Sequence, residues 1–408
     1  MIADQNNIFK FSHSEKLMPQ EEVLETNKEK RQISIGLPKE ISPEEKRIAL
    51  VPEAAGLLVQ NGHKVFIESS AGTSAHFSDH EYSEAGGQIV NSPEEVYKSD
   101  IILKVTPPAD NEIELIKNKQ TLISALQVMS QTRDYFSKLS SKKITAIAYE
   151  LIQDKTGSYP VRRLLSEIVG KEAIIIAAQY LGNQIHGRGS MLGGFPGITP
   201  SEVVILGAGT VGENATRAAL GLGAVVKIFD HSIYRLRRLQ DKLYTKLFTS
   251  IIQPKVLLKS LRTADVVIGA IHSVYGKTPC IVSEEMVRQM KPGAVIIDVS
   301  IDQGGCFETS HMTNHKEPVF KKHDVTHYCV TNIASCVPHT ASYALSNFFT
   351  PVLLKIGEEG GVDNMLRGDF GICKGVYLFN GILTNQYISD LYNLPFQDIE
   401  LLMAAFRG

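Results

Sequence analysis

Short runs of consecutive apolar residues alternate along this chain with segments in which apolar positions recur at helical spacing. In the first part of the chain, these runs predict strands at Val65–Glu68, Ile101–Val105, Thr121–Gln127 and Ile144–Tyr149, with helices between them. Alternation of this kind is typical of an α/β fold with a parallel sheet. We therefore predict a first α/β domain that begins near Ile33.

The second part of the chain shows the same alternation after a long connecting helix. A proline-free helical pattern runs from Leu164 to about Gln184 and is followed by several glycines, so a domain boundary is expected near Pro160. The elements predicted beyond it are strands at Val203–Leu206, Val225–Phe229, Val266–Ala270 and Ala294–Val299, with helices at Ile233–Leu247 and Ser283–Met290. This order indicates a doubly wound nucleotide-binding domain, and a helix from Thr340 to Ile356 then returns towards the first domain.

The strand that opens the second domain leads directly into a glycine-rich turn and a helical segment. Gly207 suits the sharp turn, Gly209 lets the backbone approach a pyrophosphate, and Gly212 permits close packing of the helix on the strand. The next strand ends at Asp230, which is where a ribose-binding acid is expected, roughly 20 residues beyond the glycines. This context favours a dinucleotide site over a purely structural glycine-rich turn.

The composition agrees with a globular protein whose partner is a small molecule. The chain has 408 residues, enough for two or three domains, and 43% of them are apolar. Its formal net charge of −2, with acids and bases intermixed, argues against a nucleic-acid partner and against an anionic membrane surface. The longest apolar run, around Ala173–Ala178, falls well short of the roughly 20 residues of a membrane span, so no bilayer crossing is expected.

Residues 1–32 form a polar extension in which Lys and Glu are interspersed without an apolar core, unlike a secretory signal. A short helix is expected near Glu21–Lys30. The cysteines are odd in number, lack C-x-x-C spacing and suit reduced thiols in a cytoplasmic protein: Cys280, Cys306, Cys329, Cys336 and Cys373. We interpret them as small buried side chains rather than nucleophiles.

Two basic residues lie where loops leave the predicted first sheet. Arg47 follows the first strand, and its guanidinium could clamp a substrate carboxylate through paired hydrogen bonds, although a solvated loop charge is the plain alternative. Lys104 ends an apolar strand, where its ammonium could bind or polarise a carbonyl substrate or simply extend to solvent.

Acidic residues flank the end of the last strand in the nucleotide-binding domain. Asp298 and Asp302 precede Gly304 and Gly305, which would let the loop approach a nicotinamide ring. One of the two acids could transfer a proton or orient a water, whereas capping of the strand end is the alternative.

Two histidine pairs, His311 with His315 and His323 with His327, have a spacing that a metal could use. Their segment contains Pro318 and lacks both a helical pattern and an H-E-x-x-H motif, so no metal site is predicted.

Three stretches together resemble the NAD-dependent alanine dehydrogenases, a family related to the nucleotide-binding subunit of proton-translocating transhydrogenase. They are Met191-Leu-Gly-Gly-Phe-Pro-Gly-Ile, Val295-Ile-Ile-Asp-Val-Ser-Ile-Asp-Gln-Gly-Gly-Cys-Phe-Glu and the segment from Tyr328 to Asn347. The resemblance extends from about Ile33 to Phe396. It implies reversible oxidation of L-alanine to pyruvate and ammonia by hydride transfer to NAD, in a homohexamer.

The resemblance also implies an architecture of two Rossmann-like doubly wound parallel-sheet domains. The substrate domain, residues 33–160 and 339–408, would be discontinuous around an NAD-binding domain of residues 161–338. Residues at the family's substrate and acid/base positions are Arg47, Lys104 and Asp302; residues at its cofactor positions are Ser166, Thr210, Val211, Asp230, Arg235, Ile271 and Asn332. Asp230 favours NAD, because a carboxylate that binds both ribose hydroxyls would repel a 2′-phosphate.

Several positions depart from the family pattern. Gln127 stands where the family has a catalytic histidine, and glutamine can orient a substrate or water but cannot exchange a proton near neutral pH. Loss of a general acid/base costs roughly 10²–10⁴ in rate unless another group replaces it. His311 replaces an arginine, and a loop that includes His272 replaces a more apolar one beside the cofactor.

Two functions are therefore open at this level. The first is an active alanine dehydrogenase in which Lys104 and Asp302 carry the proton transfers and Gln127 orients. The second is an NAD-binding protein with a different amino or 2-oxo acid substrate, or with a transhydrogenase-like or regulatory role. The retained Arg47, Lys104 and Asp302 favour the first function, and Gln127 favours the second.

Overall fold

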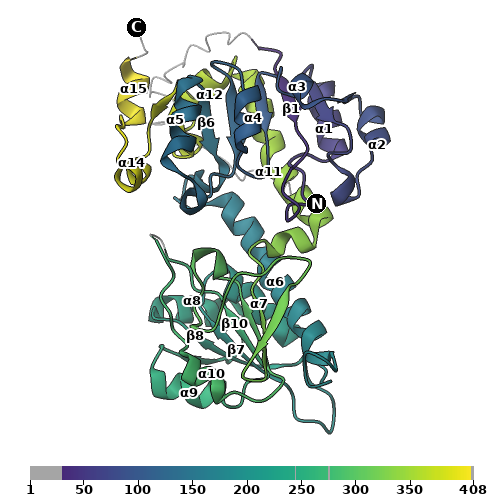
Figure 1. Cartoon of the computed structure of the whole chain (residues 1–408), viewed down its shortest axis with the longest axis vertical. Coiled ribbons are helices and arrows are strands. Elements are labelled where there is room, and N and C mark those ends of the chain that lie inside the picture. The colour runs from purple at the N-terminus through teal and green to yellow at the C-terminus, as the bar shows by residue number, and fades with distance from the viewer. Residues whose placement is uncertain (1–29, 244, 274–275, 406–408) are drawn as a thin grey trace, which may run out of the picture.

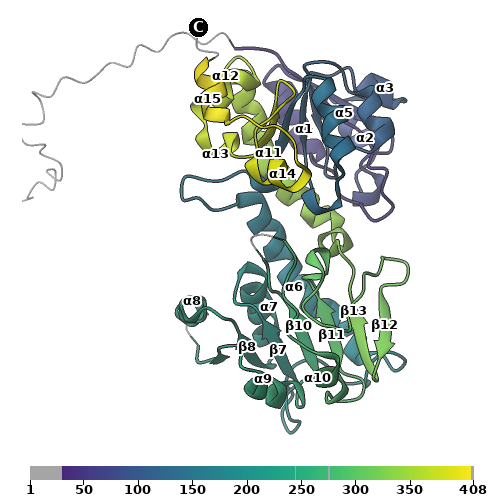
Figure 2. The same cartoon turned by 60° about the vertical axis from the view of Figure 1, so that its left-hand side comes forward.

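The computed structural model describes residues 30–243, 245–273 and 276–405, and it consists of two α/β domains, each built on its own sheet (Figure 1). The first domain contains an eight-stranded sheet and the second a seven-stranded sheet. Helices α6 (Pro160–Gly182) and α11 (Pro338–Glu358) lie where the chain passes between the domains (Figures 1 and 2). The expected fold class, with two Rossmann-like domains and the first domain interrupted by the second, is confirmed.

The first sheet has the strand order β15-β14-β6-β5-β4-β1-β2-β3. Its strands are β1 (Ser34–Leu37), β2 (Lys64–Glu68), β3 (Gln88–Val90), β4 (Ile101–Leu103), β5 (Thr121–Ser124), β6 (Thr145–Ala148), β14 (Val376–Phe379) and β15 (Ile382–Leu383). The pairs among β1 to β6 are parallel, and β14 joins β6 in the antiparallel direction. The carboxyl ends of β1, β4, β5 and β6 therefore point to one edge, where ligands bind in open α/β sheets.

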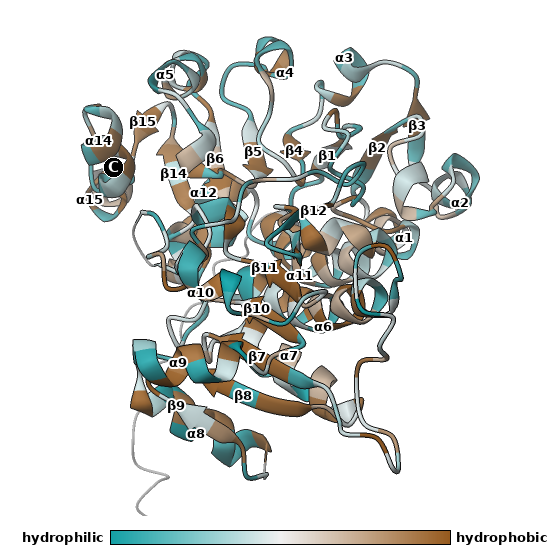
Figure 3. Ribbon diagram, turned by 60° about the horizontal axis from the view of Figure 1, so that its bottom comes forward, coloured by the Kyte–Doolittle hydropathy of each residue, from teal (hydrophilic) through white to brown (hydrophobic). Residues whose placement is uncertain are grey.

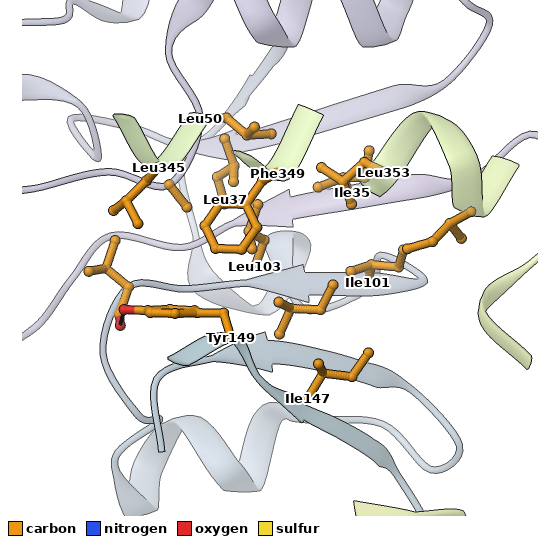
Figure 4. Packing of buried hydrophobic residues seen from close by; sticks show 14 of the residues in the cluster. Ile35, Leu37, Leu50, Ile101, Leu103, Ile147, Tyr149, Leu345, Phe349 and Leu353 are labelled. Carbon is orange, nitrogen blue, oxygen red and sulfur yellow. Dashed lines mark hydrogen bonds between the residues drawn. The ribbon is translucent and has the colours of Figure 1, made fainter. Parts of the chain in front are cut away.

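The helices of the first domain follow its strands and are completed by the end of the described chain. They are α1 (Pro52–Gln60), α2 (Asp79–Glu84), α3 (Pro93–Val96), α4 (Asp110–Leu115), α5 (Arg133–Ser141), α12 (Val362–Gly368), α13 (Phe370–Cys373), α14 (Gln386–Tyr392) and α15 (Ile399–Ala405). Leu345, Phe349 and Leu353 of α11 pack against Ile35 and Leu103 of the sheet (Figure 4). The returning helix thus supplies part of this domain's core.

The second sheet has the order β12-β13-β11-β10-β7-β8-β9. Its strands are β7 (Glu202–Leu206), β8 (Val225–Phe229), β9 (Phe248–Ser250), β10 (Val266–Gly269), β11 (Val295–Asp298), β12 (Val319–Lys322) and β13 (Val325–Tyr328), and only the β12–β13 pair is antiparallel. Its helices are α7 (Thr210–Gly221), α8 (Ile233–Leu243), α9 (Pro254–Leu261) and α10 (Glu284–Arg288). The strands of both sheets are mostly hydrophobic, as expected for sheets that helices cover (Figure 3).

Helix α6 packs against α7 at a point where no side chain fits. A Cβ on Gly170 would collide with the Val211 backbone oxygen. This close approach places the connecting helix beside the glycine-rich turn, so residues of α6 help to form the site there.

The predicted and observed elements differ at several boundaries. The strand predicted over Thr121–Gln127 ends at Ser124, and the connecting helix begins at Pro160 rather than Leu164, because proline is well accommodated in a first helical turn. The short β9, the α9 helix, the β12–β13 hairpin and the strands after α11 were not predicted from the apolar pattern. The helix expected near residues 21–30 lies almost wholly outside the described residues. Within the described part of the chain, no helix combines the length and apolarity that a bilayer crossing requires.

Candidate functional site

The glycine-rich turn connects β7 to α7 with the geometry of an anion-binding loop. Gly207 has a φ of +109°, which favours glycine, and Gly212 has no room for a Cβ because the Gly207 carbonyl oxygen lies against it. Gly209 is the N-cap of α7, and nothing lies within 4 Å of a Cβ built there. The open space before a helix N-terminus allows close approach of a pyrophosphate.

Asp230 fixes this turn from the neighbouring strand. Its Oδ2 atom accepts the Ala208 N–H at 2.8 Å, and its Oδ1 atom accepts the Ser232 N–H at 2.8 Å. The side chain is buried, and the nearest guanidinium nitrogen of Arg235 lies 3.9 Å from Oδ2. Each carboxylate oxygen has further acceptor capacity, so the predicted ribose contact is compatible with these bonds.

A cavity adjoins the turn between α6 and the carboxyl ends of β10 and β11. Its lining residues are Leu165, Ser166, Val169, Val211, Ala270, Ile271, His272, Val299, Ser300, Asp302, Gln303, Thr331 and Ile333. The structure therefore brings together the predicted residues Ser166, Val211, Ile271, His272 and Asp302. Arg47, Lys104 and Gln127 are not among the lining residues, because they belong to the first domain.

The two candidate acids after β11 have different surroundings. Asp298 is fully buried and accepts the N–H groups of Ser300 and Cys306, each at 3.1 Å, which is the capping role considered above. Asp302 lies in a short 3₁₀ segment, Ile301–Gln303; it lines the cavity and is solvent-exposed, whereas Asp298 is not. Desolvation by the surrounding protein raises the pKa of the Asp302 carboxyl to about 6, in the range of a proton-transfer group.

Arg47 lies in the loop after β1 and is buried beside Glu45. Its Nε and Nη2 atoms donate to the two carboxylate oxygens of Glu45 at 2.7 Å and 2.6 Å. Burial lowers the pKa of the Arg47 guanidinium, but the negative Glu45 outweighs burial and the pKa is raised. Arg47 is therefore charged and held in place, with its fork directed at Glu45.

Lys104 follows β4 and is almost completely buried. Its Nζ atom lies 2.6 Å from Glu112 and 3.3 Å from Glu40, and the Tyr97 hydroxyl donates to Glu112 at 3.0 Å. Burial lowers the pKa of the Lys104 ammonium, but the two carboxylates outweigh it and the pKa is raised. Lys104 thus remains protonated within an acidic cluster.

Gln127 follows β5 in a left-handed conformation, with φ 48° and ψ 54°, and its side chain is exposed. The Glu150 Oε1 atom accepts the N–H groups of Leu126 and Gln127 at 2.7 Å and 3.1 Å. Burial raises the pKa of the Glu150 carboxyl, and its Oε2 atom is a buried oxygen without a hydrogen-bond partner in the described structure. The Glu150 carboxyl group thus contacts the backbone of Gln127, the residue at the position where the alanine dehydrogenases that this sequence resembles have a histidine.

Asn332 connects the two domains next to Arg47. Its Nδ2 atom donates to Glu45 Oε2 at 2.9 Å and to the Glu44 carbonyl oxygen at 3.2 Å. The Lys46 N–H donates to Ser335 Oγ at 2.8 Å in the same region. The predicted cofactor residue Asn332 is thus in contact with the loop that carries the predicted substrate residue.

The two histidine pairs have separate structural surroundings. His327 is buried, lies 2.8 Å from Thr309 Oγ1 and stacks on Phe320, while His323 pairs with Glu284 at 2.7 Å. His315 lies 3.9 Å from Glu44, and His311 stacks on Phe320 at 3.7 Å between ring centroids. In the described ranges, no group of three or more His, Cys, Asp and Glu side chains is arranged to hold a metal ion.

Sequence reasoning missed five charged residues of this region: Glu40, Glu45, Glu112, Glu150 and Arg162. Only Glu45 carries a local signal, since it precedes Arg47 by two positions and can reach its guanidinium. The other four lie on loops or helices whose proximity to the predicted residues depends on the fold. Arg162 in the first turn of α6 contacts His272 of the cavity through Nη2 and Nε2.

Comparison with known proteins covers both domains. Residues 36–169 match the family model "Alanine dehydrogenase/PNT, N-terminal domain", and residues 173–386 match "Alanine dehydrogenase/PNT, C-terminal domain". The alanine dehydrogenase of Mycolicibacterium smegmatis is 37% identical over 371 residues, which cover 91% of this chain and 100% of that protein. That of Methanococcus maripaludis is 39% identical over 368 residues, which cover 90% of this chain and 98% of that protein.

Solved structures agree with these sequence matches. An L-alanine dehydrogenase superposes with a TM-score of 0.84 at 36% identity, covering 88% of this chain and 99% of the other. A transhydrogenase from Sinorhizobium meliloti gives a TM-score of 0.73 at 22% identity, covering 86% of this chain and 99% of the other, which supports the fold alone.

Proposed function

We propose how the residues of this chain, which belongs to the alanine dehydrogenase/PNT family, serve the NAD-dependent oxidation of L-alanine. The reaction is the reversible oxidative deamination of L-alanine to pyruvate and ammonia, and NAD is the cofactor. It consumes L-alanine, NAD⁺ and water, and it releases pyruvate, ammonium, NADH and a proton.

The second domain fits NAD. The open Gly209 position and the N-terminus of α7 would hold the pyrophosphate, while Asp230 would hold the adenosine ribose. Ser166, Thr210, Val211, Arg235, Ile271, His272 and Asn332 are proposed as further cofactor contacts. When bound, NAD⁺ accepts the hydride from the substrate Cα.

The chain's own residues would then manage charge and protons around the substrate. Arg47 and Lys104 lie at the ligand-binding edge of the first sheet. There, the two side chains would bind the substrate carboxylate. Asp302 would accept a proton from the water that adds to the oxidised substrate carbon, which requires its carboxylate form. Gln127 would orient the substrate or that water through its amide.

The observation that supports this assignment best is the position of Asp302, which lines the cavity beside the glycine-rich turn and whose carboxyl has a pKa of about 6. The decisive experiment measures NADH formation with L-alanine, a panel of other amino acids and 2-hydroxy acids. We expect L-alanine to be oxidised. Tight NADH binding without turnover of any panel member would overturn the proposal.

Gln127 supports a second candidate function, an NAD-binding protein with a different amino or 2-oxo acid substrate, or with a transhydrogenase-like or regulatory role. Its amide cannot supply the proton that an imidazole would. In the same assay, preference for another panel member over L-alanine would favour this alternative.

We also propose a homohexamer, with residues 33–160 and 339–408 as the substrate domain and residues 161–338 as the NAD domain. The family resemblance supports the assembly. The five free cysteines support a reducing, cytoplasmic location. Sizing the protein with and without residues 1–32 would test the assembly: a monomer in both cases would contradict the hexamer, and a difference between them would assign a role to the extension.

A further inference from the structure

The positive charges assigned to the substrate in the first domain are already neutralised. Arg47 shares two hydrogen bonds with Glu45, and Lys104 contacts both Glu112 and Glu40. These side chains are almost fully buried, so solvent does not weaken the pairs. A carboxylate substrate that approaches these residues meets no net positive charge, because the two cations already face three carboxyl groups.

Arg162 is a cation in the same region with a different environment. It lies in the first turn of α6, ahead of the cavity residues Leu165 and Ser166, and its guanidinium carbon lies 5.1 Å from the centroid of the Tyr159 ring. Within the described residues, no carboxylate forms an ion pair with it. Its side chain is partly exposed, which leaves donors available to a ligand.

His272 holds this guanidinium without neutralising it. The two side chains contact each other through Arg162 Nη2 and His272 Nε2. Burial, followed by the positive charges of Arg162 and Arg235, lowers the pKa of the His272 imidazole to about 4. The ring is therefore neutral at physiological pH and acts as an acceptor, so the full positive charge of Arg162 remains.

The charge of Arg162 reaches both sides of the proposed site. It lowers the pKa of Asp302 in the second domain and that of Glu150 in the first, although burial outweighs it in both groups. Glu150 adjoins Tyr149, whose phenol is influenced by the charge of Arg47. The positive charge of Arg162 therefore acts on a carboxyl group of each domain.

We propose that Arg162 binds a carboxylate of the substrate and supplies the net positive charge that the Arg47 and Lys104 clusters lack. A guanidinium held from one side by a neutral imidazole can present its remaining N–H groups to a carboxylate as a fork. The carboxylate is either the α-carboxylate of the amino acid or a second carboxylate on its side chain. This inference rests on the proposed dehydrogenase function.

The test compares Arg162→Met, which keeps the apolar stem, and Arg162→Lys with the wild-type enzyme. Arg163→Met is the matched control, because Arg163 is the adjacent exposed residue and pairs with Glu167 at 3.2 Å. The measurements are kcat and KM for L-alanine and L-aspartate and the Kd of NADH by fluorescence. Binding of oxalate to the NADH complex gives a readout that does not require turnover.

For Arg162→Met, loss of a charge-assisted contact should raise the KM for the bound amino acid and the Kd of oxalate about 10- to 100-fold, with the NADH Kd and the Arg163→Met enzyme unchanged. Arg162→Lys should recover part of the loss. A rise with L-alanine assigns the α-carboxylate, whereas a loss confined to L-aspartate assigns the side-chain carboxylate.

Unchanged KM values in an active Arg162→Met enzyme, or a change in the NADH Kd alone, would overturn the inference and leave the dehydrogenase function standing. A wild-type enzyme that oxidises no amino acid would instead overturn the proposed function. In that case, oxalate binding that is equal in wild type and Arg162→Met would also overturn the carboxylate site.

Discussion

The Oε1 atom of Glu150 accepts the backbone N–H of Gln127 at 3.1 Å and so holds a glutamine in the left-handed region, with φ 48°. Non-glycine residues adopt this region at a cost of about 1–2 kcal/mol per residue. The cost is offset here by hydrogen bonds to a buried carboxyl group. The Gln127 side chain is therefore exposed on a turn whose backbone conformation Glu150 holds in place.

Gln127→His tests whether this turn lacks only a proton-exchanging group. If so, turnover of L-alanine should rise by about 10²–10⁴, because imidazole can act as a general acid near neutral pH. Steady-state kinetics with a constant NADH Kd would check this, and Gln127→Ala serves as the control that removes the amide without adding a base. An unchanged rate would mean that this position does not limit catalysis.

Substitutions of Glu150 should separate its hydrogen bonds from its charge. Glu150→Gln keeps an oxygen that can accept the Leu126 and Gln127 N–H groups, whereas Glu150→Ala leaves both donors unpaired. We expect Glu150→Ala to lower the free energy of unfolding by about 1–3 kcal/mol and Glu150→Gln to lower it much less. Urea unfolding monitored by fluorescence measures the difference. Equal losses of unfolding free energy in the two variants would contradict a stabilising role for the hydrogen bonds to Leu126 and Gln127.

The pKa of Asp302 predicts the acid limb of the pH–rate profile. A general base acts in its deprotonated form, so kcat/KM for L-alanine should rise with pH below about 6 and level off above it. In Asp302→Asn this limb should vanish, and the rate should fall by about 10²–10⁴. Retention of the same limb in Asp302→Asn would assign it to another group.

Asp230 should set the preference for NAD over NADP. Asp230→Asn keeps a side chain of the same size with an oxygen that can accept the Ala208 N–H. It removes the negative charge that would repel a 2′-phosphate. The ratio of NADP to NAD affinity should therefore rise by at least about tenfold. A tenfold change corresponds to about 1.4 kcal/mol, which is within the energy of one close charge–charge contact near a protein surface. Asp241→Asn, on the exposed side of α8, is the control. Equal affinities of the wild-type enzyme for both cofactors would contradict the role of Asp230.

The sequence predicts those features that depend on neighbouring residues. Gly207 and Gly212 lie where the local strand-turn-helix pattern put them, and the observed turn has no room for larger residues there. Asp298 and Asp302 look alike in sequence, and only the fold shows that Asp298 caps buried N–H groups while Asp302 lines the cavity. To tell such residues apart, one must know which groups surround each side chain in space. The spacing of apolar residues along the sequence does not give this information.

Pairings between distant elements account for what the sequence left out. Lys104 was recognised at a strand end, but its partner Glu112 lies on the next helix and Glu40 on another loop. Likewise, β14 was missed because it pairs with β6 from the far end of the chain. Ion pairs and sheet edges of this kind form only when the whole chain has folded, so local rules cannot anticipate them.

Because β14 pairs with β6, the two domains can complete their folding at different times during synthesis. All strands of the second sheet lie between residues 202 and 328, whereas the first sheet waits for residues 376–383 to leave the ribosome. The NAD domain can therefore fold as a unit on the nascent chain while its partner still lacks two strands. Until they arrive, β6 is an open sheet edge, and this edge is where association with other nascent chains is most expected.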